Sequence, residues 1–210
     1  HTFQRVGYLS PIAMPGSTTA IKEPWRMAVS YLQDAVGNDF QDLSVPGLRD
    51  IESEKFAIIS AMIAKRVNAP MTSSLGRLFD GVAANLGIRS RVNFEGQAAM
   101  ELEMLSSARA DGSYEFEWNK NDEVYRILAA PIIRGLLADL QKGVSIARIG
   151  AKFHQSLIWL FADVCKAVRR DNGLDRVVLS GGVFQNATLL ACLKSALEDL
   201  HFKVFTHEQV

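Results

Sequence analysis

The sequence has very few cysteines and no formal net charge. Its 210 residues include only two cysteines, Cys165 and Cys192. That number excludes the disulfide framework of a small secreted domain and makes a reducing, cytoplasmic setting the default expectation. The 23 basic side chains are balanced by 23 acidic ones, so the formal net charge is zero. We therefore expect no nucleic-acid partner, because a general nucleic-acid binder carries a basic surface.

Long apolar runs and metal-binding motifs are also missing. No uninterrupted apolar stretch approaches the roughly 18 residues that span a bilayer, so we expect no membrane partner. The sequence contains no CxxC or HxxxH pattern, and the residues one helical turn from His154 are Gly150 and Ile158, which bind no metal. Neither a Ser-His-Asp arrangement nor a reactive cysteine is indicated, since both cysteines lie in apolar helical patterns typical of a core. We expect no catalytic and no metal-ligating residue here.

Helical periodicity dominates the residues that are present. Apolar side chains recur at three- and four-residue spacing, which predicts helices at 24–36, 49–67, 74–87, 96–109, 130–141, 145–171 and 186–200. Alternating apolar and polar residues over 113–129 predict a β-hairpin joined across Asn119–Asp122. Short apolar runs at 176–179 and 202–205 flank the last helix and predict a β-α-β unit. The whole pattern predicts a helix-rich α/β fold.

The most specific local pattern lies between the strand predicted at 176–179 and the helix predicted at 186–200. It reads Ser180-Gly181-Gly182-Val183-Phe184-Gln185-Asn186. Paired glycines let the backbone turn sharply and let a ligand approach, and the following helix N-terminus favours a phosphate or a nucleotide edge. The alternative is a plain tight turn with Asn186 as N-cap of the helix. The pattern is neither a Rossmann fingerprint nor a P-loop.

Asp80 occupies an unusual position on its predicted helix. A helical wheel places it beside the apolar stripe and among small residues, namely Gly76, Ala83, Ala84 and Gly87. Small neighbours let a backbone or a flat ligand come close to the carboxylate. The alternative is an i,i+3 ion pair with Arg77 on a solvated face. The small neighbours favour a binding site.

Glu101 falls inside the apolar stripe formed by Ala98, Leu102, Leu105 and Ala108. Glu103 faces the opposite way, as a surface carboxylate would. A carboxylate that points into a packed face needs a partner, because an unpaired buried charge is very costly. That partner is either a structural arginine or the hydroxyls of a bound sugar, and the periodicity favours neither.

Four motifs occur in one order over nearly the whole chain. They are PGSTTAIKEPWR at 15–26, TSSLGRLFD at 72–80, FEGQAAMELE at 94–103 and SGGVFQN at 180–186. Taken together they resemble the PGGxxAxxEPWR, TSSxGRLFD, YEGQAAMELE and SGGVFQN elements of HypF-type carbamoyltransferases. Ser17 stands where that pattern has its second glycine, so the resemblance leaves the geometry of this one loop in question.

The resemblance implies a fold and an activity. Residues 1–210 would be the second lobe of an actin-like ATPase domain of the ribonuclease-H-like (ASKHA) class, with inserted helices and a β-hairpin. They would form the later part of the family's TsaD-like C-terminal domain, while the upstream lobe, the downstream metal loop, the zinc-finger segment and the adenylate-forming domain lie elsewhere. The family uses carbamoyl phosphate and ATP to make carbamoyl-adenylate. It then transfers the carbamoyl group to the C-terminal cysteine of HypE during [NiFe]-hydrogenase maturation.

The resemblance also implies roles for individual residues. Asp80 and Glu101 would accept the ribose hydroxyls of the nucleotide, and Gly96 would let the ligand approach. The purine would be held by Gly181, Gly182 and Asn186. A divalent metal is expected in the full domain, but its ligands in HxxxH and NDGG elements are not in this sequence. We therefore expect this chain by itself to be inactive.

Two alternatives stay open at this point. One is a nucleoside O-carbamoyltransferase of the antibiotic-tailoring type, which shares the motifs but modifies a small sugar hydroxyl. The other is a non-catalytic part of the protein that serves as a docking surface for a HypE-like partner. Saturable ATP binding separates the second alternative from the other two, because a docking module binds no nucleotide.

Overall fold

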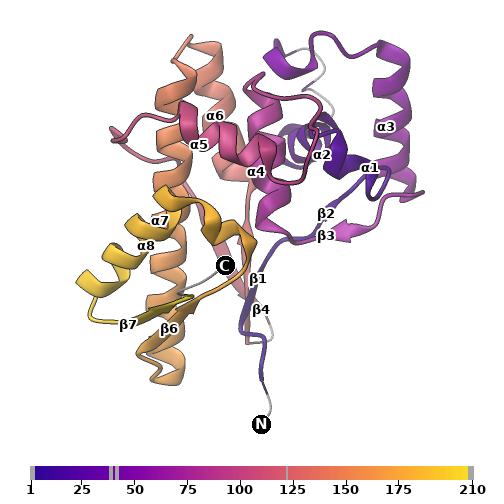
Figure 1. Cartoon of the computed structure of the whole chain (residues 1–210). Helices are drawn as coiled ribbons and strands as arrows, with labels where there is room; N and C mark the ends of the chain where they lie inside the picture. The colour runs from indigo at the N-terminus through magenta and orange to yellow at the C-terminus, as the bar shows by residue number, and fades with distance from the viewer. Residues whose placement is uncertain (1–2, 38–39, 41–42, 122, 208–210) are drawn as a thin grey trace.

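The computed structural model describes residues 3–37, 40, 43–121 and 123–207 and contains a helix-rich α/β fold (Figure 1). Its α-helices are α1 (Thr19–Lys22), α2 (Trp25–Val36), α3 (Ser53–Lys65), α4 (Leu75–Asn85), α5 (Gln97–Leu105), α6 (Ala130–Gln141), α7 (Ile146–Asn172) and α8 (Ala187–Asp199). Two 3-10 turns, η2 (Pro46–Leu48) and η3 (Gly182–Gln185), connect them to neighbouring segments. Every helix that the apolar periodicity predicts is present.

Within the part of the chain that the structure describes, the strands form three small sheets. In the first sheet β5 (Val124–Leu128) lies between β1 (Gly7–Leu9), which is parallel to it, and β4 (Glu117–Asn121), which is antiparallel. The second sheet pairs β2 (Ile12–Ala13) with β3 (Met71–Thr72). The third pairs β6 (Arg176–Leu179) with β7 (Lys203–Thr206) in parallel, with α8 between them in sequence. The predicted hairpin and the predicted β-α-β unit are therefore confirmed.

Several predicted boundaries are wrong by a few residues. The helix predicted at 96–109 ends at Leu105, and Ala108 beyond it is exposed. The hairpin ladder includes Asn119 and Asn121, which the sequence placed in the turn; Asp122 lies outside the described residues. Residues 1–20 were expected only as an entry segment, yet they contribute β1, β2 and the start of α1. Strands of two or three residues carry too little periodicity to predict.

The core forms where α2 crosses α4 and α6. Tyr31 of α2 and Phe79 of α4 are each 1% exposed, and both belong to the cluster of buried apolar residues. At Gly81 a Cβ atom would lie 2.8 Å from Cδ2 of Tyr31, so the tyrosine ring occupies the space that a larger residue would need. Close packing at this glycine lets α4 lie directly against α2.

The two cysteines differ in environment. Cys165 of α7 is partly buried, and burial raises the pKa of its thiol to about 11. Cys192 of α8 is exposed, so the expectation that it belongs to the core is wrong. Its helix packs one face through Leu189, Leu193 and Leu197, and residue 192 lies outside that stripe.

The long helix α7 runs the length of the molecule, with α8 and the β6–β7 sheet beside it and α2 and α3 on the far side of α4 (Figure 1). Across the described ranges, no helix combines the length and the apolar content that a membrane crossing requires. The arrangement brings the start of α8 close to α4 and α5, although these segments are far apart in the sequence.

Candidate functional site

A cavity of about 620 Å³ lies where α4, α5 and the η3–α8 segment meet. Three of the motifs found in the sequence contribute to its wall. The lining residues are Ser74, Leu75, Gly76, Arg77, Phe79, Asp80, Glu95, Gly96, Ala99, Met100, Glu103, Gly182, Val183, Gln185 and Asn186. Of the six predicted nucleotide-binding residues, the fold brings Asp80, Gly96, Gly182 and Asn186 to this one cavity.

Asp80 lines the cavity from α4 and is 3% exposed. Its Oδ2 lies 3.1 Å from Nη1 of Arg77, and Nη2 of Arg77 donates a hydrogen bond to Glu95 at 3.2 Å. The ion pair that the sequence offered as an alternative therefore exists, but it lies in the cavity wall and not on a solvated face. Burial raises the pKa of Asp80 to about 6, with Arg77 opposing the rise and Glu95 adding to it. A carboxyl group with such a pKa in a cavity marks a candidate functional site.

Glu101 and Glu103 lie in surroundings that differ from those expected. Glu101 does not line the cavity: Arg89 Nε donates to its Oε2 at 2.6 Å, and Gln97 Nε2 donates to its Oε1 at 3.0 Å. The hydrogen bond from Arg89 holds the pKa of Glu101 below its usual value. Of the two partners that the sequence left open, a structural arginine and the hydroxyls of a sugar, the structure shows the arginine. A sugar-binding position for Glu101 is not supported by this geometry.

Glu103 lines the cavity, so the expectation that it is an ordinary surface carboxylate is wrong. The backbone N–H of Thr188, in the first turn of α8, donates to its Oε1 at 2.8 Å. The helical wheel placed Glu103 correctly on the face opposite Glu101. It could not show that η3 and α8 return from far along the chain to cover that face.

Asn186 has two roles in the structure. Its Oδ1 accepts a hydrogen bond from the backbone N–H of Leu189 at 2.7 Å, so it is the N-cap of α8 that the sequence predicted as one alternative. It also lines the cavity beside Gly182. The capping role and a binding role are therefore compatible, because the cap uses only the oxygen of the amide.

Gly96 and Gly181 need to be glycine because of their backbone conformation. Their φ angles are 85° and 105°, in the region that L side chains rarely adopt. Gly96 precedes α5 at the cavity, and no atom lies within 4 Å of where its Cβ would be. Gly181 does not line this cavity but an adjoining one, and Gly182 lines both cavities.

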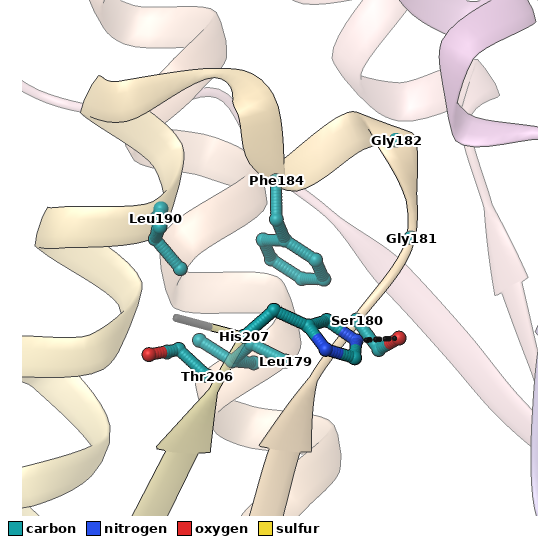
Figure 2. A pocket seen from close by; sticks show the side chains of 8 residues that line it. All are labelled: Leu179, Ser180, Gly181, Gly182, Phe184, Leu190, Thr206 and His207. Carbon is teal, nitrogen blue, oxygen red and sulfur yellow. Dashed lines mark hydrogen bonds between the residues drawn. The ribbon is translucent and has the colours of Figure 1, made fainter. Parts of the chain in front are cut away.

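The adjoining cavity, of about 300 Å³, opens at the ends of β6 and β7 (Figure 2). Ser180 Oγ and His207 Nε2 face each other there at 2.7 Å, with the ring of Phe184 and the side chain of Leu190 nearby. We did not predict this pair from the sequence. The signal was available, because parallel pairing of Leu179 with Thr206 places the next residue of each strand side by side.

The family model described as "Carbamoyltransferase, Kae1-like Domain, second subdomain" matches residues 1–210. The chain belongs to the HypF carbamoyltransferase family. The resemblance that the four motifs carry is thereby confirmed.

Relatives in other organisms are similar over nearly the whole chain. It is 31% identical over 214 residues to the carbamoyltransferase HypF of Synechocystis sp. (strain ATCC 27184 / PCC 6803 / Kazusa), which covers 96% of this chain and 27% of that protein. It is 34% identical over 209 residues to the carbamoyltransferase HypF of Rhizobium leguminosarum bv. viciae, covering 95% of this chain and 25% of that protein. The chain thus spans about a quarter of the length of these HypF proteins.

A solved structure agrees with the fold. The crystal structure of full-length HypF in the phosphate- and nucleotide-bound form superposes with a TM-score of 0.92 at 36% identity. The match covers 100% of this chain and 27% of that one. The fold described above is therefore the fold of this part of HypF.

The side chains of the described residues offer no cluster of metal ligands. Over the described ranges, no group of three or more His, Cys, Asp or Glu side chains converges in a way that could hold a metal ion. Metal sites need several such ligands in a fixed geometry. These residues do not fit the divalent metal that the HypF resemblance implies, and we assign no ligand to it.

Proposed function

We propose that this chain is the nucleotide-binding lobe of a HypF-type carbamoyltransferase and that the cavity between α4, α5 and α8 holds the adenosine part of ATP or carbamoyl-adenylate. The observation that carries the proposal is the meeting of Asp80 and Glu103 with the Gly182–Asn186 turn around one cavity. Carboxylate oxygens accept hydrogen bonds from ribose hydroxyls, and a glycine turn admits a flat ring. A HypF relative was crystallised in a phosphate- and nucleotide-bound form, which supports the same reading.

The residue assignments differ in one respect from those that the resemblance implies. Asp80 and Glu103 take the role of hydroxyl acceptors, because Glu101 is occupied by Arg89. Gly96 and Gly182 admit the ligand, and Asn186 offers an amide N–H to it. Gly181 contributes by shaping the turn.

In the whole protein, the chain would be the second lobe of an actin-like ATPase domain and would work with the parts of HypF outside it. The acceptor would be the C-terminal cysteine of HypE in hydrogenase maturation. Its sulfur forms a bond to the carbamoyl carbon while the bond from that carbon to the phosphate oxygen of AMP breaks. AMP leaves with the electron pair, and the thiol proton passes to solvent. This chain would contribute by positioning the adenylate, and positioning alone accelerates such transfers substantially.

The test is calorimetric titration of the chain with ATP and with AMP. We expect saturable binding by the wild type and a dissociation constant raised at least about tenfold in Asp80→Ala, the loss typical of a hydrogen bond to a charged group. Lys194→Ala, on the exposed side of α8, serves as the control and should leave the constant unchanged. An unchanged constant in Asp80→Ala would overturn the assignment. Absence of saturable binding by the wild type would favour the docking-surface alternative.

A further inference from the structure

His154 belongs to α7, directly behind the wall of the nucleotide cavity. The residue is 2% exposed, and its ring packs against Phe79 and Phe153 at centroid distances of 5.4 and 5.8 Å. The function proposed above does not use this histidine. Because burying a polar ring costs free energy unless both nitrogens are satisfied, its hydrogen bonds need an explanation.

The hydrogen bonds of His154 fix its tautomer. Nδ1 lies 2.8 Å from the carbonyl oxygen of Gly150, and Nε2 lies 3.0 Å from Nδ2 of Asn186. A carbonyl oxygen only accepts, so Nδ1 carries the proton. In the neutral ring Nε2 is then the acceptor, and Asn186 donates to it.

The other end of the Asn186 amide is fixed as well. Its Oδ1 accepts from the backbone N–H of Leu189 at 2.7 Å. A flip of the amide would place oxygen against Nε2 and nitrogen against an N–H donor, and both hydrogen bonds would be lost. One polar chain with a single direction therefore runs from the Gly150 carbonyl through His154 and Asn186 to the start of α8.

We propose that His154 is a positioning residue for this cavity: its neutral ring holds the Asn186 amide in the one orientation that presents the second Nδ2 proton to a bound nucleotide. An amide nitrogen carries two protons, and His154 takes only one of them. Asn186 itself lines the cavity. The identity of the ligand rests on the proposed function, whereas the polar chain does not.

Protonation of His154 would break this arrangement. A charged imidazole donates from both nitrogens, so Nε2 would face a second donor in Asn186. Burial lowers the pKa of His154, while the bond to Gly150 and the charge of Glu103 on α5 favour the protonated ring. The other groups around the ring are Phe79 of α4 and the Asn186 amide at α8, and Asp80 and Arg77 of α4 line the same cavity. Burial and the Asn186 donor that faces Nε2 thus both favour the neutral ring, which takes up its second proton on acidification.

Two substitutions separate the acceptor role from simple packing. His154→Gln places a non-titrating amide oxygen where it can accept from Asn186, and His154→Phe keeps a ring but removes the acceptor. AMP dissociation constants would be measured by calorimetry from about pH 8 to about pH 5, the range in which histidine titrates. Asp80→Asn serves as the control for the second group in the cavity that titrates in this range.

We expect His154→Phe to raise the dissociation constant about tenfold at pH 8, the loss typical of one hydrogen bond, and His154→Gln to stay within about threefold of the wild type. The wild type should lose affinity on acidification, and His154→Gln should lose less. An unchanged constant in His154→Phe, or the same acid loss in His154→Gln as in the wild type, would overturn the inference.

A nuclear magnetic resonance measurement on the ligand-free chain keeps the inference separate from the proposed function. We expect the ¹⁵N shifts of His154 to report a proton on Nδ1, and the side-chain amide signals of Asn186 to move as that ring titrates. If the wild type binds no AMP, the proposed function fails while this measurement still decides the role of His154. A proton on Nε2 would contradict the inference, and so would Asn186 side-chain signals that do not shift as His154 is protonated.

Discussion

The Glu103 carboxylate accepts a hydrogen bond from the backbone N–H of Thr188 at 2.8 Å and so joins α5 to the first turn of α8. The N–H groups of a first helical turn have no partner within the helix and carry a partial positive charge. A carboxylate at this point satisfies one of them, and Glu103 also lines the cavity. The same residue thus supports the fold and, in our proposal, the ligand.

Glu103→Ala should lower the free energy of unfolding by about 1–2 kcal/mol, because it leaves the Thr188 N–H without its acceptor. Urea denaturation followed by circular dichroism measures this. The substitution should also weaken AMP binding. Glu101→Ala is the matched control on the same helix, and it should leave AMP affinity unchanged because Glu101 contacts Arg89 outside the cavity. Weaker binding in Glu101→Ala with normal binding in Glu103→Ala would reverse our assignment of the two glutamates.

Asp80 should make stability depend on pH. Its pKa of about 6 in the folded chain exceeds the ordinary value of 3.8, so between these values the folded state holds a proton that the unfolded state has lost. The stabilisation is complete below the ordinary value and is lost as the pH rises through about 6. By linkage the loss is at most about 3 kcal/mol. Urea denaturation of the wild type and of Asp80→Asn at several pH values gives the free energy of unfolding as a function of pH. The loss appears as a steeper fall of this free energy with pH in the wild type than in Asp80→Asn. Equal slopes would show that burial does not raise this pKa.

Ser17 lies in the loop where the family pattern has its second glycine. Its φ angle is 53°, a conformation that costs a serine roughly 1 kcal/mol and a glycine almost nothing. Ser17→Gly should therefore raise the free energy of unfolding by up to about 1 kcal/mol, once the extra freedom of glycine in the unfolded chain is subtracted. Gly16→Ala should do the opposite, because its φ is 88° and a Cβ would lie 2.9 Å from Nη1 of Arg26. Thermal unfolding of both variants tests these two opposite predictions. A Ser17→Gly variant that is less stable than the wild type would contradict the first.

The cysteines should react at very different rates. Cys192 is exposed, whereas the pKa of the Cys165 thiol is raised by burial and little of it is thiolate at neutral pH. A disulfide reagent should label one thiol rapidly in the folded chain and the second only after denaturation. In Cys192→Ser the rapid phase should disappear. Rapid labelling that survives this substitution would place the reactive thiol at Cys165.

Sequence reasoning predicted the elements whose signal is local. Residues close together in the sequence were enough to predict the helices α6 and α7, the hairpin β4–β5 and the Gly181-Gly182 turn. The strands β1, β2 and β3 were not, because two or three residues carry no period and their partners lie far away along the chain.

The same limit applies to the cavity. The wheel correctly placed Glu101 and Glu103 on opposite faces of α5. The expectation that Glu101 points into a packed face is wrong, because Leu105 of the same stripe is 51% exposed. The residues that contact each glutamate come from elsewhere in the sequence. The sequence led us to consider His154 only as a metal ligand, because its partner Asn186 is 32 positions away and could not be seen from the residues near it on α7. Local pattern therefore predicts which residues share a surface, and only the fold shows what lies against it.

The contact between Glu103 and Thr188 joins positions 85 residues apart, and this separation has a consequence for folding. Closing a loop of that length costs more conformational entropy than closing any helical turn or the β4–β5 hairpin, so the cavity should be among the last features to form. A ligand that binds only the closed cavity stabilises only the fully assembled chain. The nucleotide concentration in the cell would then affect the fraction of newly synthesised protein that stays folded, as well as the rate of its reaction.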